Sequence, residues 1–176
     1  MKIFLVGFMG SGKTTVGREL AGRLSMPFFD LDELVEASEQ MTIKELFAEK
    51  GEPYFRKRER DLLKSTHHVE RAVIATSAGT FAFDENMQWI ETEGLSVYLA
   101  APLPLLLSRM GEKSAERPMF HDESAARELF LHRLKYYKVA NLTIEMRADQ
   151  TATEVVERLL LQLPREAHSL RPGGQY

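Results

Sequence analysis

Short apolar runs alternate along the chain with longer stretches in which apolar residues recur every three or four positions. Each short run has the length of a strand, and unbroken apolar runs are typical of strands covered on both faces. The pattern predicts five strands, at residues 3–6, 27–30, 72–76, 96–99 and 142–144. Alternation of such strands with helices predicts a three-layer α/β/α fold with a parallel five-stranded sheet, in one domain over residues 1–164.

The longer stretches have helical spacing. They predict helices at residues 12–25, 34–67, 102–110, 123–138 and 151–163. The second helix is expected to break near Gly51 and Pro53, because both residue types interrupt helices. Thr151 and Glu154 have the spacing of a capping box, which predicts where the last helix begins. We predict an irregular segment at residues 111–122 and a disordered tail at residues 165–176.

The composition is that of an ordinary globular domain. Of the 176 residues 44% are hydrophobic, and the formal net charge of −3 argues against a nucleic-acid binder. Cysteine is absent, which excludes disulfides, thiolate metal sites and cysteine nucleophiles. No stretch approaches the roughly 20 apolar residues that a bilayer-spanning helix needs. We therefore expect a cytoplasmic protein, a monomer, with no membrane or nucleic-acid partner.

A glycine-rich segment follows the first predicted strand. Residues 7–14, with the sequence GFMGSGKT, match the phosphate-binding pattern G-x-x-x-x-G-K-[ST] and lead into a helix. Glycines let backbone N–H groups approach phosphate oxygens, and the start of the helix adds a positive dipole end. The strand–loop–helix context disfavours the alternative of a chance glycine turn. The residues expected to bind the nucleotide are Gly10, Ser11, Gly12, Lys13, Thr14 and Thr15.

The nucleotide is predicted to be ATP, bound with Mg²⁺. The guanine-recognition pattern N-K-x-D does not occur, which argues against GTP. The Thr14 hydroxyl would ligate magnesium. The third predicted strand does not end in the usual aspartate but runs directly into Ser77, so the second ligand must come from elsewhere. Asp30 is the candidate.

Two carboxylates, Asp30 and Asp32, follow the second predicted strand. In extended backbone, residues i and i+2 point to one face, so both would face the crevice at the carboxyl end of the sheet. One carboxylate could hold Mg²⁺, while the other accepts a hydrogen bond from an attacking hydroxyl and acts as its base. The alternative is that Asp32 only caps the helix that follows.

Five blocks resemble the shikimate kinase family in order and spacing. They are Gly7–Arg18, Phe29–Asp32, Gly51–Glu59, Arg117–Met119 and Arg133–Ala140. The resemblance extends from Met1 to about Pro164. It implies a nucleoside-monophosphate-kinase-like fold, a substrate-binding region at about 31–61 and a mobile lid at about 110–124. It also implies transfer of the ATP γ-phosphate to the 3-hydroxyl of shikimate.

The resemblance further implies a role for each matching residue. Asp32, Lys13 and Arg117 would be catalytic, with Asp32 holding the reacting hydroxyl and Arg117 reaching the transferring phosphate. Asp30 and Thr14 would support Mg²⁺. Arg109 would stack on adenine. The residues implied for the acid substrate are Arg56, Arg133, Gly79, Phe47 and Phe55, with Glu59 orienting Arg56.

Each of these residues also has a plainer interpretation. Arg56 lies in the run RKRER, and Arg133 lies near Lys135, so both arginines could belong to solvated helix faces. Phe47 and Phe55 are ordinary candidates for a core.

The sequence departs from the family after the third strand. Three glycines are usual there, and this chain has Ser77, Ala78 and Gly79. A replaced position that requires a positive φ would cost about 1 kcal/mol or more. Three functions therefore stay open: a shikimate kinase, a kinase for another small hydroxy acid such as gluconate, and an ATP-binding regulator that transfers no phosphate.

Overall fold

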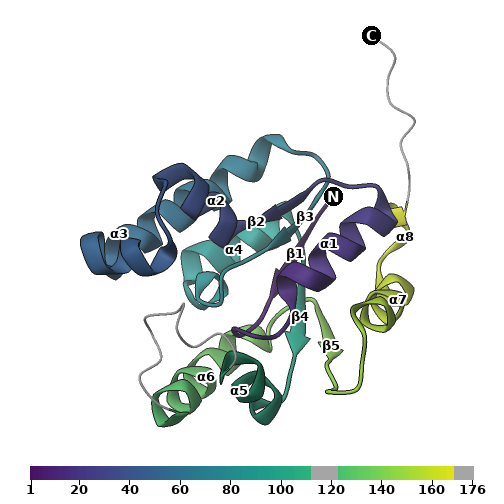
Figure 1. The fold of residues 1–176 in the computed structure, drawn as a ribbon. Helices are drawn as coiled ribbons and strands as arrows, with labels where there is room; N and C mark the ends of the chain where they lie inside the picture. Colours follow the sequence, from purple (N-terminus) through teal and green to yellow (C-terminus); the bar gives the residue numbers. More distant parts are fainter. Residues whose placement is uncertain (112–122, 169–176) are drawn as a thin grey trace.

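The computed structural model describes residues 1–111 and 123–168, which form a fully parallel sheet covered by helices (Figure 1). Its strands pair in the order β2-β3-β1-β4-β5. They are β1 (Lys2–Val6), β2 (Phe28–Asp30), β3 (Ala72–Ala75), β4 (Gly94–Ala100) and β5 (Leu142–Glu145). The five predicted strands and their parallel arrangement are confirmed, with ends that differ by one or two residues.

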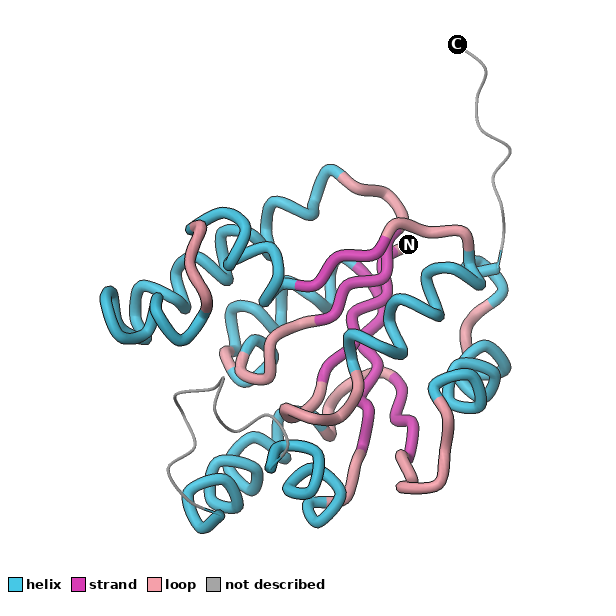
Figure 2. The backbone as a smooth tube through the Cα atoms, in the orientation of Figure 1, coloured by secondary structure: helices cyan, strands magenta, loops and turns pink. Residues whose placement is uncertain are grey.

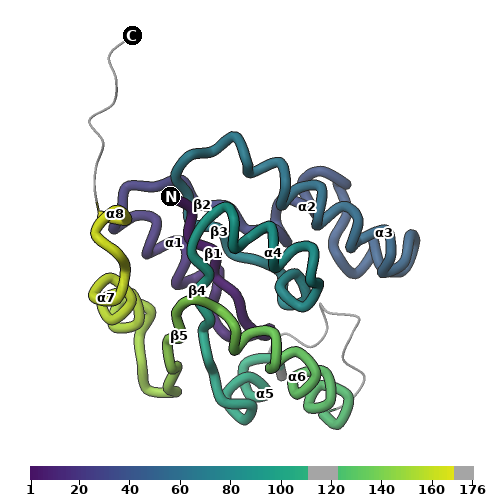
Figure 3. The backbone as a smooth tube through the Cα atoms, turned by 180° about the vertical axis from the view of Figure 1, so that it is seen from behind, coloured from purple at the N-terminus to yellow at the C-terminus, as the bar shows by residue number. Residues whose placement is uncertain are grey.

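Helices lie on both faces of the sheet, as the front and back views agree (Figures 2 and 3). Helices α1 (Lys13–Leu24) and α7 (Ala152–Gln162) pack together on one side. The other side carries α4 (Asp84–Glu93), α5 (Leu103–Gly111) and α6 (Glu123–Tyr137). Helices α2 (Leu31–Glu39) and α3 (Ile43–Ser65) project together beyond the β2 edge, and the short α8 (Arg165–His168) follows α7.

Burial explains why the apolar runs become strands. Every residue of β1 and β3 is buried, as expected for central parallel strands with helices on both faces. A second, smaller cluster lies away from the sheet, between α2 and α3, with Val35, Leu46 and Phe55 at its centre. The α2–α3 pair therefore has a core of its own.

The predicted helix at residues 34–67 is wrong in part, because two helices occupy this region. Helix α2 ends where Gln40 adopts a left-handed conformation with φ 53°, and α3 begins at a capping box formed by Thr42 and Glu45. The predicted break at Gly51 is confirmed, since Gly51 has φ 76° and ψ 171° inside α3. Helix α4 was not predicted; its buried residues are only Asn86 and Ile90, which give weak helical spacing.

The predicted tail begins too early. Residues 165–168 form α8, where Ala167 is fully buried and its carbonyl accepts a hydrogen bond from Arg71 Nη2 at 2.9 Å. The rest of that predicted tail, residues 169–176, lies outside the described residues, as do residues 112–122 of the predicted lid. The capping box at Thr151 and Glu154 is confirmed. No described helix is long and apolar enough to cross a membrane.

Candidate active site

The glycine-rich loop joins β1 to α1 in the conformation that an anion cradle needs. Gly10 has φ 75° and Gly12 has φ 93°, a region that side chains other than glycine rarely adopt. A Cβ atom on Gly10 would lie 3.3 Å from the carbonyl oxygen of Leu106, so the loop is also tightly packed from behind. Helix α1 begins directly after the loop, with Gly12 as its N-cap, so the unpaired N–H groups of its first turn add donors next to those of the loop. The loop is therefore built to take phosphate groups.

Two polar side chains of the loop agree with this assignment. Lys13 Nζ donates hydrogen bonds to the carbonyl oxygens of Gly7 at 2.8 Å and Phe8 at 3.0 Å, which keeps the ammonium group over the loop. The hydroxyl of Ser11 is buried and has no hydrogen-bond partner among the described residues. A buried polar atom without a partner is costly unless a ligand or water satisfies it. Ser11 is not among the residues that line the neighbouring cavity, so its predicted role in nucleotide binding stays a prediction.

Asp30 connects the loop to α2. Its Oδ2 accepts a hydrogen bond from Thr14 Oγ1 at 2.7 Å, and its Oδ1 accepts from the backbone N–H groups of Asp32 at 3.0 Å and Glu33 at 3.4 Å. A hydroxyl and a carboxylate side by side are the oxygen ligands that Mg²⁺ prefers. Thr14 and Asp30 therefore fit the predicted metal position.

The structure corrects the reasoning about Asp32. Asp30, the last residue of β2, is the N-cap of α2, and Asp32 lies in the first turn of the helix. The two carboxylates therefore do not alternate along an extended strand, and Asp32 is not the cap either. Both nevertheless line the same cavity as the loop.

This cavity has a volume of about 370 Å³ and lies between the loop, α2, α5 and the start of α7. It brings together most of the predicted nucleotide residues: Gly10, Gly12, Lys13, Thr14, Thr15 and Arg109. Arg109 Nη1 donates to the carbonyl oxygen of Gly10 at 3.1 Å, which places its side chain beside the loop. Arg117, predicted to reach the phosphate, lies outside the described residues.

Sequence reasoning missed one wall of the cavity. Met146, Gln150, Thr151 and Ala152 line it, and they lie between β5 and the first turn of α7. A signal was available, because this segment follows the carboxyl end of a parallel strand, the edge at which α/β sheets bind ligands.

The predicted acid-binding residues form a separate cluster that is not part of the cavity lining. Arg56 donates from Nη1 to Glu59 Oε2 at 3.1 Å and from Nη2 to Glu52 Oε1 at 2.9 Å. Glu59 is fully buried, and its Oε1 accepts a hydrogen bond from Thr80 Oγ1 at 2.8 Å. Glu59 therefore contacts Arg56 as its predicted orienting role requires, and that role stays a prediction. The alternative of a solvated Arg56 is wrong, because only 13% of its side chain is exposed.

Gly79 approaches this cluster closely. A Cβ atom on Gly79 would lie 2.6 Å from Arg56 Nη1 and 2.7 Å from Nη2, distances that real side chains do not show. The guanidinium group also faces two aromatic rings, with its Cζ atom 5.0 Å from the centroid of Phe55 and 5.4 Å from that of Phe83. No pattern in the sequence pointed to Phe83. The position of the Arg56 guanidinium group is therefore fixed by two carboxylates, two aromatic rings and the backbone at Gly79.

Arg133 is buried near Arg56, which also rules out a solvated helix face for it. Its exposed fraction is 5%, and its Cζ atom lies 6.0 Å from the centroid of Phe8. Burial lowers the pKa of Arg133, and the positive charge of Arg56 lowers it further. Arg56, with 13% of its side chain exposed, and the buried Arg133 repel each other, so the pair favours an anion, and a carboxylate matches the planar donors of both groups.

Phe47 and Phe55 contact each other, with ring centroids 4.9 Å apart. Phe55 is buried in the α2–α3 core, and Phe47 packs against that core from its edge. The plainer interpretation as core is confirmed for Phe55, whereas Phe47 is only partly buried. Their role as walls for a substrate ring stays a prediction.

The two residues that replace family glycines are accommodated. The described residues other than glycine with positive φ are Ser25 and Gln40, so neither Ser77 nor Ala78 is strained in this way. Ala78 is buried, and its carbonyl oxygen accepts a hydrogen bond from the Tyr137 hydroxyl. The Ser77 hydroxyl is buried and lacks a hydrogen-bond partner among the described residues.

Comparison with known proteins agrees with this geometry. A sequence model of the shikimate kinase family matches residues 9–164. The shikimate kinase of Aquifex aeolicus is 39% identical over 166 residues, which cover 93% of this chain and 96% of that protein. The shikimate kinase of Salinibacter ruber is 39% identical over 171 residues, which cover 91% of this chain and 83% of that protein. A solved structure of the Acinetobacter baumannii shikimate kinase in complex with shikimate superposes with a TM-score of 0.84 and 35% identity, and covers 90% of each chain.

Proposed function

The chain belongs to the shikimate kinase family, and we propose that it transfers the γ-phosphate of ATP to the 3-hydroxyl of shikimate. The observation that carries the proposal is a pair of guanidinium groups largely shielded from solvent, Arg56 with 13% of its side chain exposed and Arg133 with an exposed fraction of 5%, on the same chain as a phosphate loop. The pair suits a small substrate with a carboxylate at one end. The loop suits the phosphates of ATP.

Some of these residues bind the two reactants, and one accepts the proton that the reaction releases. Lys13 and the loop amides bind the β- and γ-phosphates, and Arg56 and Arg133 bind the substrate carboxylate. Asp32, at the cavity wall, accepts a hydrogen bond from the reacting hydroxyl. As the hydroxyl oxygen bonds to the γ-phosphorus and the bond to ADP breaks, the hydroxyl proton passes to the Asp32 carboxylate.

Thr14 and Asp30 would hold Mg²⁺, which supplies positive charge to phosphate oxygens when it is bound. Arg117 is proposed to add a further positive charge at the transferring phosphate. Phe47 and Phe55 as ring contacts, a monomeric state and a cytoplasmic location all stay predictions.

A turnover assay tests the proposal against its two alternatives. ADP formation is measured with saturating Mg-ATP while shikimate or gluconate is varied. We expect saturable turnover with shikimate and none with gluconate. Turnover with gluconate alone would show a kinase for another acid, and ATP binding without turnover on either acceptor would show a regulator.

A further inference from the structure

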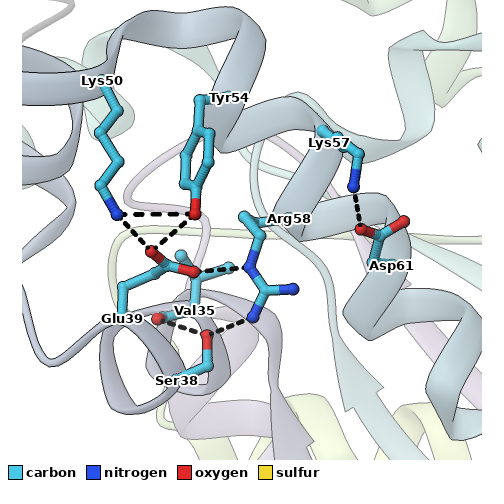
Figure 4. Close-up of polar contacts among 8 residues, drawn as sticks. All are labelled: Val35, Ser38, Glu39, Lys50, Tyr54, Lys57, Arg58 and Asp61. Carbon is cyan, nitrogen blue, oxygen red and sulfur yellow. Dashed lines mark hydrogen bonds and ion pairs between the residues drawn. The ribbon is translucent and has the colours of Figure 1, made fainter.

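A polar cluster outside the proposed reaction centre joins α2 to α3 (Figure 4). Glu39, the last residue of α2, has a side chain that is only 7% exposed. Its carboxylate accepts hydrogen bonds from Lys50 Nζ at 2.9 Å, from the Tyr54 hydroxyl at 3.1 Å and from Arg58 Nε at 2.5 Å. One carboxylate therefore has three partners, all of them on α3.

These partners lie on both sides of the break in α3. Lys50 directly precedes Gly51, whose non-helical backbone divides the helix, while Tyr54 and Arg58 follow it. Tyr54 and Arg58 are four residues apart and so share one face of the second segment. Glu39 consequently connects both segments of α3 to the end of α2, across the point where the backbone of α3 is not helical.

The second segment of α3 is also the one that presents Arg56. Two residues along a helix correspond to a rotation of about 200°. Arg56, two residues after Tyr54 and two before Arg58, therefore lies on the opposite face of the segment. One face is tied to Glu39, while the other presents the guanidinium group to Gly79.

We propose that Glu39 is a positioning residue for substrate binding, which fixes the angle of the second α3 segment and thereby the place of Arg56. The inference rests on the proposed function, because it assigns Arg56 to the substrate carboxylate. The charge of Glu39 is maintained at any working pH, since the hydrogen bonds from Lys50 and then Arg58 lower the pKa of its carboxyl group to about 2.

The alternative is that Glu39 only adds to the stability of the α2–α3 pair, which already has an apolar core at Val35, Leu46 and Phe55. The two roles differ in what they predict. A general loss of stability would affect ATP and shikimate alike, whereas a shift of Arg56 would affect shikimate alone.

The test is the variant Glu39→Gln, which keeps the size of the side chain and removes its charge. We expect KM for shikimate to rise about tenfold, which corresponds to about 1.4 kcal/mol, while KM for ATP and kcat change less than about twofold. The matched control is Asp61→Asn, which removes an exposed ion pair with Lys57 on the same helix. The control should leave all three constants unchanged.

Hydrogen exchange supplies a readout that does not depend on turnover. In Glu39→Gln, the backbone amides of residues 52–60 should exchange faster, while those of the phosphate loop keep their wild-type rates. If Glu39→Gln does not fold, Arg58→Gln is used instead, because it removes one partner that is 29% exposed and should give the same pattern more weakly.

Two results would overturn the inference. One is a wild-type KM for shikimate together with wild-type exchange at residues 52–60. The other is a parallel rise of both KM values with faster exchange throughout the domain. If the wild-type protein shows no turnover with shikimate, the proposed function fails, and exchange at residues 52–60 alone decides whether Glu39 positions the segment.

Discussion

Replacement of Gly79 by alanine should separate the two halves of the site. The new Cβ atom would lie 2.6 Å from Arg56 Nη1, and ordinary contact begins at 3.4 Å, so the guanidinium group has to move by about 0.8 Å. The movement opposes the hydrogen bonds of Arg56 to Glu52 and Glu59. The backbone itself is not strained, because Gly79 has an ordinary φ of −98°.

The expected magnitude follows from the geometry of a charged hydrogen bond. A displacement of this size is enough to lose one hydrogen bond between Arg56 and the carboxylate of the substrate. Hydrogen bonds to charged groups contribute about 1.5–3 kcal/mol each. KM for shikimate should therefore rise about tenfold to a hundredfold. KM for ATP should stay near the wild-type value, because Gly79 and Arg56 are not among the residues that line the nucleotide cavity.

The assay is ADP formation at saturating Mg-ATP with varied shikimate, followed by the same measurement with varied ATP. The matched control is Gly22→Ala, since a Cβ atom on Gly22 meets no atom within 4 Å. The control should keep both KM values and raise the unfolding free energy by about 0.4–1 kcal/mol. A wild-type KM for shikimate in Gly79→Ala would refute the reasoning that Arg56 and Gly79 form the acid site.

Three further outcomes are expected. Asp32→Asn should lower kcat by about 10²-fold or more and keep the affinity for ATP, because the variant loses the proposed proton acceptor. Turnover measurements check kcat, and calorimetric titration checks the affinity for ATP. Wild-type turnover would remove Asp32 from its role. Arg133→Met should raise KM for shikimate at least about tenfold, while Lys135→Met on the exposed face of the same helix should not; equal effects would contradict the assignment. The pKa of Glu39 is lowered from 4.5 to about 2, so its ion pairs stabilise the fold above pH 4.5 and are lost as pH falls towards 2. The difference in melting temperature between wild type and Glu39→Gln should therefore narrow between pH 4.5 and 2. A constant difference would show that the ion pairs of Glu39 do not stabilise the fold.

The sheet was predictable because burial leaves a simple trace in sequence. Central parallel strands have no solvent-facing side, so β1 and β3 are uninterrupted apolar runs. The phosphate loop was equally predictable. Positive φ at Gly10 and Gly12 favours glycine, and the ammonium group beside the loop comes from the lysine of the motif, Lys13. These signals are local, and local signals can be read from one sequence.

The features that were missed depend on partners distant in the chain. Helix α2 begins at Leu31, because Asp30 at the end of β2 can cap it, which an extended-strand pattern does not reveal. Arg56 lies in a run of charges that is typical of a solvated face. Its burial follows from the approach of Gly79, 23 residues later, and from the aromatic face of Phe83.

The departure from the family after β3 can be explained because the three positions, 77, 78 and 79, differ in their contacts. The first two are occupied by Ser77 and Ala78, and neither has a backbone conformation that needs glycine. What the Ala78 position contributes is its carbonyl oxygen, which accepts from Tyr137 and is available from any residue. Gly79 differs, because a side chain there would displace the guanidinium group of Arg56. A chain that keeps this third glycine keeps the space that Arg56 occupies in the proposed acid site, so the first two replacements are compatible with activity on shikimate.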